Sequence, residues 1–591
     1  MTRYLFASGT FRTKVPPVLR VALCVCCLWL LTGCGLLGVE QNAAPPSTTA
    51  APVAQATTAP AAPTAAPTAP AEQPTGEVAS DPASFPTSAP PATPEGPGGN
   101  LIMALSAQDP TTLDPALIGD VLSAFVARQL FSGLVRLDDT LTVQSDLAER
   151  WQLSDDGRTY TFVLRENARF ADGTPITSED VRYSLERATD PALATRLPAA
   201  TYLSDIVGVR EKLSGAASSI SGVQVLDERT IALTIDQPKS FFLSKLAHPT
   251  SYVIDRQTVE RGGPSWYTQP NGSGPFTIER WDSNEVMILQ RNPNFYRDLA
   301  ELDRITFLLG ANASNALVQY EEGRVDVAEV PSFALDRVQD ESNPLSQELV
   351  MVPQLSLTYI GMNVEQPPFD DPYVRQAFTL LLDRQKIADV SLYGSVVPAY
   401  GILPPGIPGY NPELPTLAAD LARFEALLEE SRYGSAENLP PIVAYGGGWT
   451  TTLREIAAEF GVEIEVRVYE NFGTFLAELD EGTFPMYSSG WIADYPDPEN
   501  FLAVLFGTGS NENHMNYSNP QVDDLLEQAA IATNEATRAE LYREAEALIL
   551  ADAPVIPMYH DVQHVLIKPY VTGLTVTPMG ILDMSNVQLV R

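Results

Sequence analysis

Thr159-Tyr160-Thr161-Phe162-Val163-Leu164 is the stretch that decides the fold class, because it is rich in β-branched and aromatic residues throughout. Such a composition is typical of a β-strand. Residues 230–235, Thr-Ile-Ala-Leu-Thr-Ile, have the same character. We therefore expect strands at 159–164 and 230–235.

Helical patterns lie around these strands. Thr177 followed by Asp180, just before Val181, predicts a helix start with an acidic first turn. Asp371 leads a helix whose apolar positions keep three- and four-residue spacing, at Val374, Ala377, Phe378, Leu381 and Leu382. Further helices are expected over 520–531 and 534–550, and further strands over 462–468 and 555–567. The mixture predicts an α/β protein from Asn100 onward.

The N-terminal segment has the pattern of an export signal. Arg3, Arg12, Lys14 and Arg20 precede an apolar stretch at 21–31, which is shorter than the ~20 residues of a membrane-spanning helix. Leu31-Thr32-Gly33-Cys34 resembles the bacterial lipobox, in which the cysteine is lipidated and becomes the first mature residue. We expect residues 1–33 to be a signal peptide, Cys34 to carry lipid, and the protein to be anchored on the outer face of the bacterial cytoplasmic membrane.

A tether is expected to follow, over residues 34–99. Residues 41–99 hold 14 prolines, no Lys or Arg, and a single aromatic residue, Phe85. Such a segment cannot bury enough apolar surface to offset the entropy lost on ordering. The composition predicts a disordered spacer, and it also permits an O-glycosylated stalk.

Charge and cysteine content exclude several classes of protein. The net charge is −37, and removing the signal, which holds four positive and no negative charges, takes it to −41. A strongly acidic surface repels phosphate backbones, so nucleic-acid binding is not expected. All four cysteines lie within Cys24–Cys34, so the mature chain can form neither a disulfide framework nor a cysteine-based metal site.

No catalytic constellation is present in the sequence. His560 and His564 have the spacing of a helical zinc pair, but a strand there would separate them by ~13 Å. Gly446-Gly447-Gly448-Trp449 lacks the Lys-Ser/Thr that completes a phosphate-binding loop, and Gly272-Ser273-Gly274 lacks the spacing of a nucleophile elbow. We expect no enzyme activity, no metal and no cofactor, and a surface hydrolase stays a minor alternative.

The most distinctive segment is Tyr487-Ser488-Ser489-Gly490-Trp491-Ile492-Ala493-Asp494-Tyr495-Pro496-Asp497-Pro498. Its small residues let the backbone approach a partner, and Asp494 between two aromatic residues suits a ligand ammonium group. The same residues also fit a purely structural role, with Trp491 in the core and Asp494 forming a turn before Pro496.

Several segments together resemble family 5 of the extracellular solute-binding proteins, the peptide-binding receptors of ABC importers. The resemblance spans about 101–574 and rests on the order and spacing of its motifs, which are Thr112-Leu113-Asp114-Pro115, Leu147-Ala148-Glu149-Arg150-Trp151, Asp156-Gly157-Arg158-Thr159-Tyr160-Thr161-Phe162, Phe170-Ala171-Asp172-Gly173-Thr174-Pro175, Glu179-Asp180-Val181, Gly272-Ser273-Gly274-Pro275-Phe276, Arg291-Asn292-Pro293-Asn294-Phe295-Tyr296, Pro367-Pro368-Phe369-Asp370 and Val374-Arg375-Gln376-Ala377-Phe378.

The resemblance implies a class II periplasmic-binding-protein-like fold, with two α/β lobes joined by a two-strand hinge and closing on a ligand between them. It places the first lobe at 100–137, 271–356 and 563–591, the second lobe at 357–562, and an accessory domain of the first lobe, remote from the ligand, at 138–270. The hinge crossings are expected near 357–363 and 560–568.

In family members that bind oligopeptides, the aspartate of the Trp-x-Ala-Asp-Tyr segment pairs with the peptide α-ammonium. The resemblance therefore assigns ligand binding to Asp494, Trp491, Tyr495, and the backbone of Ser488, Ser489 and Gly490. The first lobe is expected to contribute Gly119 and Val121, mainly through the backbone. One departure is that such a receptor has an acidic residue at the position of Gly119, whereas this chain has Asp120 one position later.

The implied role is that of a monomeric receptor that captures peptides and delivers them to an ABC permease and its ATPase subunits. An alternative keeps the fold and role but takes an oligosaccharide or another small solute, with Trp449, Trp491 and Tyr495 as stacking surfaces.

Overall fold

The computed structural model describes residues 98–194, 196–415, 419–469 and 471–591. The expected signal peptide, Cys34 and most of the expected tether lie outside these residues. No helix of the described residues combines the length and the apolarity needed to cross a membrane.

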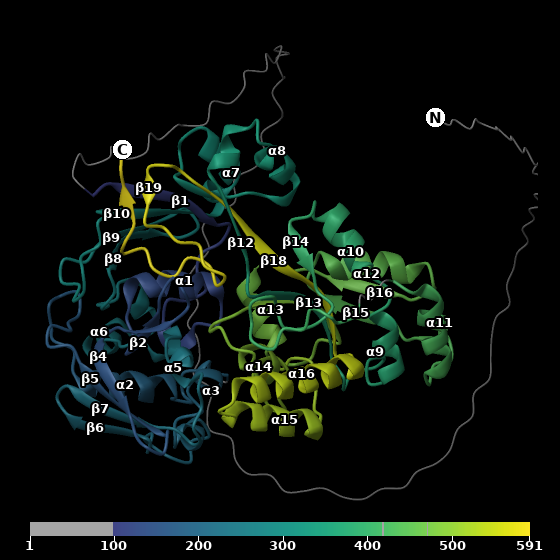
Figure 1. Ribbon diagram of the computed structural model, residues 1–591, viewed down its shortest axis with the longest axis horizontal. Helices are drawn as coiled ribbons and strands as arrows, with labels where there is room; N and C mark the ends of the chain where they lie inside the picture. The colour runs from purple at the N-terminus through teal and green to yellow at the C-terminus, as the bar shows by residue number, and fades with distance from the viewer. Residues whose placement is uncertain (1–97, 195, 416–418, 470) are drawn as a thin grey trace, which may run out of the picture. The chain divides into compact units, whose positions relative to one another are not determined.

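The strands and helices alternate along the chain, which confirms the expected α/β class (Figure 1). The strands are β1 (Asn100–Ser106), β2 (Val135–Leu137), β3 (Val143–Ser145), β4 (Ala148–Leu153), β5 (Thr159–Leu164), β6 (Val223–Asp227), β7 (Thr230–Thr234), β8 (Phe276–Asp282), β9 (Val286–Arg291), β10 (Arg304–Leu309), β11 (Val327–Glu329), β12 (Leu349–Pro353), β13 (Ser356–Met362), β14 (Val396–Pro398), β15 (Ile442–Tyr445), β16 (Ile464–Arg467), β17 (Met486–Ile492), β18 (Val555–Ile567), β19 (Val571–Thr572) and β20 (Gln588–Leu589).

The helices are α1 (Val121–Leu130), α2 (Ser178–Ala188), α3 (Ala199–Tyr202), α4 (Val209–Leu213), α5 (Phe242–Lys245), α6 (Arg256–Gly262), α7 (Ala316–Glu321), α8 (Leu335–Gln339), α9 (Pro372–Phe378), α10 (Arg384–Lys386), α11 (Leu421–Glu430), α12 (Trp449–Ala458), α13 (Phe472–Leu479), α14 (Glu499–Phe506), α15 (Pro520–Ile531) and α16 (Glu535–Asp552).

Most expected elements are present at the expected positions. The strand expected at 159–164 is β5, the strand expected at 555–567 is β18, and the helix expected at 520–531 is α15. Thr177 precedes α2 in a capping box with Asp180. The helix after Asp371 is shorter than expected and ends at Phe378, so Leu381 and Leu382 are buried outside it. The reason is local: the Asp383 side chain caps a new helical turn at α10.

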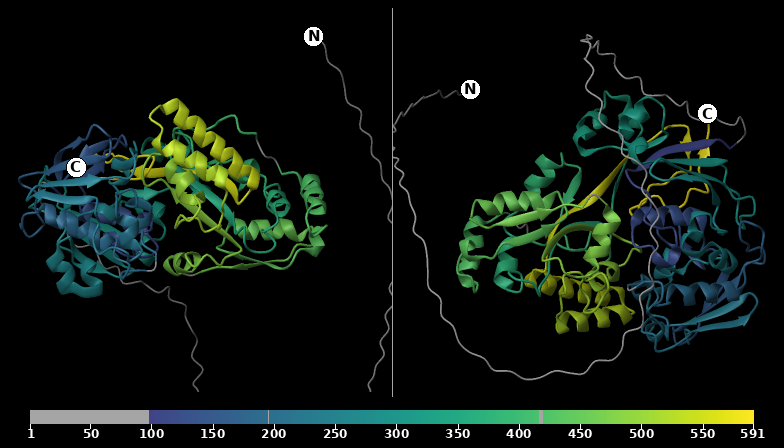
Figure 2. Two further views of the ribbon diagram at one scale, coloured as in Figure 1. Left: turned by 90° about the horizontal axis from the view of Figure 1, so that it is seen from below. Right: turned by 180° about the vertical axis from the view of Figure 1, so that it is seen from behind.

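One strand joins the two parts of the main sheet. The first half of β18 pairs with β13 and β14, whereas its second half pairs with β11 and β12. The sheet order is β16-β15-β17-β13-β18-β11-β1-β10-β9-β8. In Figures 1 and 2, β18 accordingly runs from the group of elements around β13 and β15 to the group around β1 and β10.

A second connection runs beside it. β12 ends at Pro353 opposite Val562, and β13 begins at Ser356, already paired with β17. At residues 353–356 the chain therefore passes from the part of the sheet that contains β11 to the part that contains β13. This crossing lies just before the range of 357–363 expected for it, whereas the crossing of β18 lies within the expected range of 560–568.

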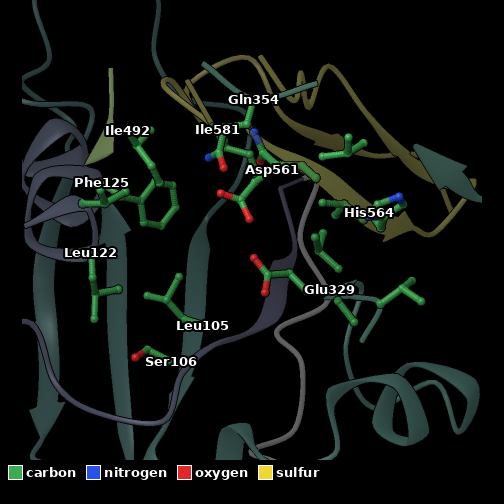
Figure 3. Close-up of a pocket in the computed structure, with 18 of the residues that line it drawn as sticks. Leu105, Ser106, Leu122, Phe125, Glu329, Gln354, Ile492, Asp561, His564 and Ile581 are labelled. Carbon is green, nitrogen blue, oxygen red and sulfur yellow. The ribbon is translucent and has the colours of Figure 1, made fainter. Parts of the chain in front are cut away.

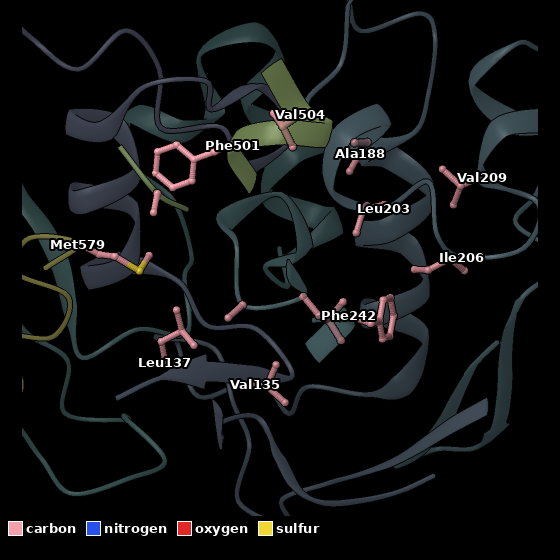
Figure 4. Packing of buried hydrophobic residues seen from close by; sticks show 14 of the residues in the cluster. Val135, Leu137, Ala188, Leu203, Ile206, Val209, Phe242, Phe501, Val504 and Met579 are labelled. Carbon is pink, nitrogen blue, oxygen red and sulfur yellow. The ribbon is translucent and has the colours of Figure 1, made fainter. Parts of the chain in front are cut away.

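A separate antiparallel sheet, β4-β5-β7-β6, lies within the segment expected to be the accessory domain. Its apolar face forms one continuous cluster with residues from distant parts of the chain. In Figure 4, Leu203 and Phe242 from this segment lie in the same packed region as Phe501 and Val504 of α14. Burial of this kind stabilises the fold by about 25 cal/mol per Å² of apolar surface.

Candidate functional site

Strand β17 has an edge with no strand partner over its second half. On one side it pairs with β13 along its whole length, with Gly490 opposite Thr358. On the other side β15 pairs with it only at Met486 and Tyr487. Among the described strands, nothing pairs with that edge from residue 488 to residue 492. An unpaired edge of this kind offers backbone groups to an added strand.

A cavity of about 560 Å³ lies beside the end of this strand. Its walls are mainly apolar and come from β1, α1, β17 and the C-terminal segment, with Leu105, Leu122, Phe125, Ile492 and Ile581 among the lining residues. Two acidic side chains, Glu329 and Asp561, also face it (Figure 3). The volume falls within the range of about 300–1,000 Å³ that is usual for small-molecule sites.

Asp494 lines a second, small cavity of about 40 Å³. The lining of this cavity includes Arg128, which also lines the larger one, so the two cavities adjoin at this side chain. The small cavity has room for about one water-sized group, such as an ammonium. Asp494 follows Ile492 by two positions, a step of ~7 Å in an extended chain.

Three side chains hold the Asp494 carboxylate. The Tyr202 hydroxyl donates a hydrogen bond to Oδ2 at 2.6 Å, and His248 Nε2 lies 3.6 Å from Oδ1. The Asn500 side-chain amide donates to Oδ2 at 3.5 Å, and its oxygen accepts from the Asp494 backbone N–H at 2.9 Å. Burial raises the pKa of Asp494, and the Tyr202 hydrogen bond partly opposes that rise.

His248 supplies no positive charge to this carboxylate. Its ring stacks on Tyr202 with centroids 3.6 Å apart, and burial lowers its pKa well below the usual range. The imidazole is therefore neutral at physiological pH. Arg128, which lines the same small cavity, lowers the pKa of Asp494 against the effect of burial, and a cationic ligand group would add a second positive charge.

The three aromatic residues named from the sequence line neither cavity. The Trp491 indole N–H donates to Asn500 Oδ1 at 3.1 Å, and the Trp449 indole N–H donates to the Tyr559 hydroxyl at 3.2 Å. Tyr495 is fully buried and its hydroxyl donates to Glu499. The partner of Trp449, Tyr559, is itself a residue that lines the larger cavity.

Two residues before or at the start of α1, Gly119 and Val121, were also predicted to contact the ligand, and only one of them lines a cavity. Val121, the first residue of α1, lines the larger cavity and is 48% exposed. Gly119 does not line it, and a Cβ added there would meet no atom within 4 Å. Asp120 is the N-cap of α1, accepting from the Ser123 N–H at 2.8 Å. Asp120, one position after Gly119, therefore has a structural role as a helix cap.

Sequence reasoning missed two side chains that contact Asp494 and two acidic side chains that line the larger cavity. Tyr202 and His248 belong to the segment expected to be remote from the ligand, yet both contact Asp494. Glu329 and Asp561 are single acids within strands, which in a sequence look like solvated positions. A usable signal was present for Asp561, because it interrupts the apolar run of β18.

The remaining histidines make ordinary structural contacts. His560 Nδ1 lies 2.7 Å from the Ser356 carbonyl oxygen, and burial lowers the pKa of His560 to about 4. The described residues contain no cluster of three or more His, Cys, Asp or Glu side chains arranged to hold a metal ion.

The fold defines the class of protein. A mixed sheet crossed by one shared strand, with a cavity beside the crossing, is the class II periplasmic-binding-protein fold with two lobes. Residues 142–513 match the middle segment of the bacterial extracellular solute-binding proteins, family 5. The chain belongs to that family.

Several named proteins align with most of the chain. It is 33% identical over 490 residues to the probable deoxycholate-binding periplasmic protein YgiS of Escherichia coli, which covers 79% of this chain and 89% of that protein. It is 31% identical over 482 residues to the periplasmic oligopeptide-binding protein OppA of Escherichia coli, covering 78% and 88%. Among solved structures, the murein tripeptide binding protein MppA of Escherichia coli matches with a TM-score of 0.76 and 26% identity, covering 83% of this chain and 98% of MppA.

Proposed function

We propose that this chain is the extracytoplasmic substrate-binding component of an ABC importer and that its ligands are peptides. Relatives named as oligopeptide- and murein-peptide-binding proteins support the class of ligand. The observation that carries the proposal is the Asp494 carboxylate, which faces a cavity of ammonium size beside a cavity of peptide size.

The geometry supports one arrangement of the peptide. The α-ammonium group occupies the small cavity on Asp494, and the main chain runs along the unpaired edge of β17 from Ser488 to Ile492. Side chains then enter the larger cavity, which begins at Ile492. Recognition through the backbone and the terminal amine admits many side chains.

The capture step is closure of two lobes. In this proposal the first lobe comprises residues 100–137, 271–356 and 563–591, the second comprises 357–562, and 138–270 form the accessory domain. Asp494 comes from the second lobe, whereas the other residues that line the small cavity come from the first lobe and the accessory domain, so closure completes this cavity. The free energy for closure comes from the higher affinity of the closed state for ligand.

Membrane attachment and partners complete the proposal. Lipid on Cys34 and a spacer to residue 99 hold a monomeric receptor near the permease and ATPase subunits. The family is one of solute-binding proteins, and we propose that the chain binds its ligand without turning it over.

Peptide binding can be tested with the terminal amine as the variable. Calorimetric titration of the full-length protein with trialanine and with N-acetyl-trialanine should show binding of the free amine about 10- to 100-fold tighter, because a charge-assisted hydrogen bond contributes roughly 1.5–3 kcal/mol. D494N should remove most of this difference. D524N, which changes an exposed acid of α15, should keep it. Equal affinity for the two peptides in the wild-type protein would exclude Asp494 as the amine anchor.

The oligosaccharide alternative has less support. Trp449, Trp491 and Tyr495 would have to stack on sugar rings, but none of them is among the residues that line the cavities. Binding of cello- or xylo-oligosaccharides in the same titration, with no binding of peptides, would favour it.

A further inference from the structure

The larger cavity contains two carboxylates that the arrangement above does not use. Glu329 ends β11 and lies opposite Val565 of β18 in the sheet register. Asp561 precedes Val565 by four residues on β18, and residues spaced by an even number along a strand face the same side. Glu329 and Asp561 therefore project from one face of the sheet, and Figure 3 shows both carboxylates directed into the cavity.

Neither carboxylate is neutralised by the protein. Asp561 Oδ2 accepts from the Ser356 hydroxyl at 3.0 Å and from the Thr358 hydroxyl at 3.5 Å, both neutral donors. Within the described ranges, neither Glu329 nor Asp561 forms an ion pair with a Lys, Arg or His side chain.

Arg128 and His564 also line the larger cavity. Arg128 lines the small cavity as well, together with Asp146, Asp494 and Asp583. His564 has its pKa lowered by burial and is neutral at physiological pH. Among the described residues, neither of these two side chains forms an ion pair with Glu329 or Asp561.

The surroundings disfavour an unpaired charge on Asp561 more than on Glu329. Asp561 is half-buried and Glu329 is exposed, and desolvation raises the pKa of both carboxyl groups above the usual values. Carboxylates in such a place are stabilised by a cation that enters with its own apolar stem. Lysine and arginine side chains have this chemistry, a methylene stem with a charged end.

We propose that the larger cavity selects a cationic peptide side chain, whose charged group is attracted by Glu329 and Asp561 while its methylene stem contacts the apolar walls. This inference rests on the proposed function and specifies its ligand class as basic peptides. Because Ile492 is two residues from the amine anchor, the selected side chain belongs to one of the first residues of the peptide.

The same carboxylates disfavour an anionic ligand. One relative is named as a probable deoxycholate-binding protein, and deoxycholate carries a carboxylate. An anion placed in this cavity would approach Glu329 and Asp561 without a dedicated cation to offset the repulsion. Deoxycholate therefore serves as a control ligand for the proposal.

The test compares side chains of similar length in one peptide frame. Ala-Lys-Ala and Ala-Arg-Ala are titrated into the full-length protein beside Ala-norleucine-Ala and Ala-citrulline-Ala, with deoxycholate as a further ligand. We expect the charged peptides to bind about 10- to 100-fold more tightly than their neutral counterparts. E329Q and D561N should each reduce that preference, and the double variant should remove it.

Two controls separate charge recognition from damage to the site. Ala-norleucine-Ala should bind each variant as it binds the wild-type protein, which shows that the cavity is intact. E341Q, which changes an exposed acid outside the cavity, should keep the preference. Equal affinity for Lys and norleucine peptides in the wild-type protein would overturn the inference but leave the peptide proposal standing. Binding of deoxycholate with no binding of any peptide would overturn both.

Discussion

Asp114, in the motif Thr112-Leu113-Asp114-Pro115, is 3% exposed and anchors two distant segments. Arg187 of α2 donates to both carboxylate oxygens, at 2.8 Å and 2.5 Å. The Trp266 indole N–H donates to Oδ2 at 2.9 Å. D114N removes the negative charge and presents an amide N–H₂ to one of these donors, so Arg187 is left as a buried charge without a counter-ion.

The expected loss follows from this geometry. Removing one partner of a buried ion pair costs about 3–5 kcal/mol. For the 492 residues from Asn100 to Arg591, an unfolding entropy of about 2.1 cal/mol/K per residue gives roughly 1 kcal/mol/K. Scanning calorimetry at pH 7 should therefore show the transition about 3–5 °C lower in D114N than in the wild-type protein.

A double-mutant cycle supplies the decisive control. R187M in the D114N background should cost much less than R187M alone, because the charge it removes is no longer paired. A shift below about 1 °C for D114N, or additive shifts in the double variant, would refute the assignment of this ion pair as a stabilising contact.

Two further predictions concern packing and pH. G274A should destabilise the protein by about 1–3 kcal/mol or more, because a Cβ there would lie 2.5 Å from the Gln129 carbonyl oxygen and 2.7 Å from the Phe131 nitrogen. The control is G119A, where a Cβ would meet no atom within 4 Å, and it should have no such effect in the same calorimetric scan. His560 is neutral in the folded state with a pKa of about 4, below its value of about 6.5 when unfolded, so the unfolded state binds more protons and stability falls as pH decreases from about 6.5 to 4. This group alone contributes roughly 3 kcal/mol to that fall, so the melting temperature of the wild-type protein should decrease more steeply with acid than that of H560Q, and parallel curves would contradict the buried neutral histidine.

Sequence patterns predicted correctly those strands and helices whose structure depends only on their own residues. The strand at 159–164 and the helix at 520–531 need only the alternation or periodicity of their own residues. The strand expected at 462–468 is shorter, β16, because Val468 lies 69% exposed beyond its end. The alternation of apolar residues in the sequence does not show at which residue the strand stops packing against the core.

The candidate site was less predictable because it is assembled from remote segments. Asp494 was singled out by its own neighbours in sequence, and the structure places it beside a cavity. Tyr202, which donates a hydrogen bond to it, is 292 residues away, and nothing in the local sequence around 202 indicates that contact. Glu329 and Asp561 share a cavity only because β11 and β18 are neighbours in the sheet.

Asp561 lies on β18 at the point where that strand passes from one part of the sheet to the other. Its backbone N–H donates to the Ser356 hydroxyl at 2.9 Å, so the acid is also tied to the start of β13, beside the second crossing. In the proposed closure, both crossings lie near the rotation axis, where displacement is smallest. Asp561 would then keep its place in the separated and the closed lobes alike, whereas the small cavity at Asp494 needs Arg128 and the other lining residues of the opposite side. A basic peptide would therefore bind first through its cationic side chain, close to the rotation axis. Its terminal amine would be enclosed at Asp494 only when the lobes close. The distance of each acid from the hinge thus sets the order in which the two groups of the peptide are recognised.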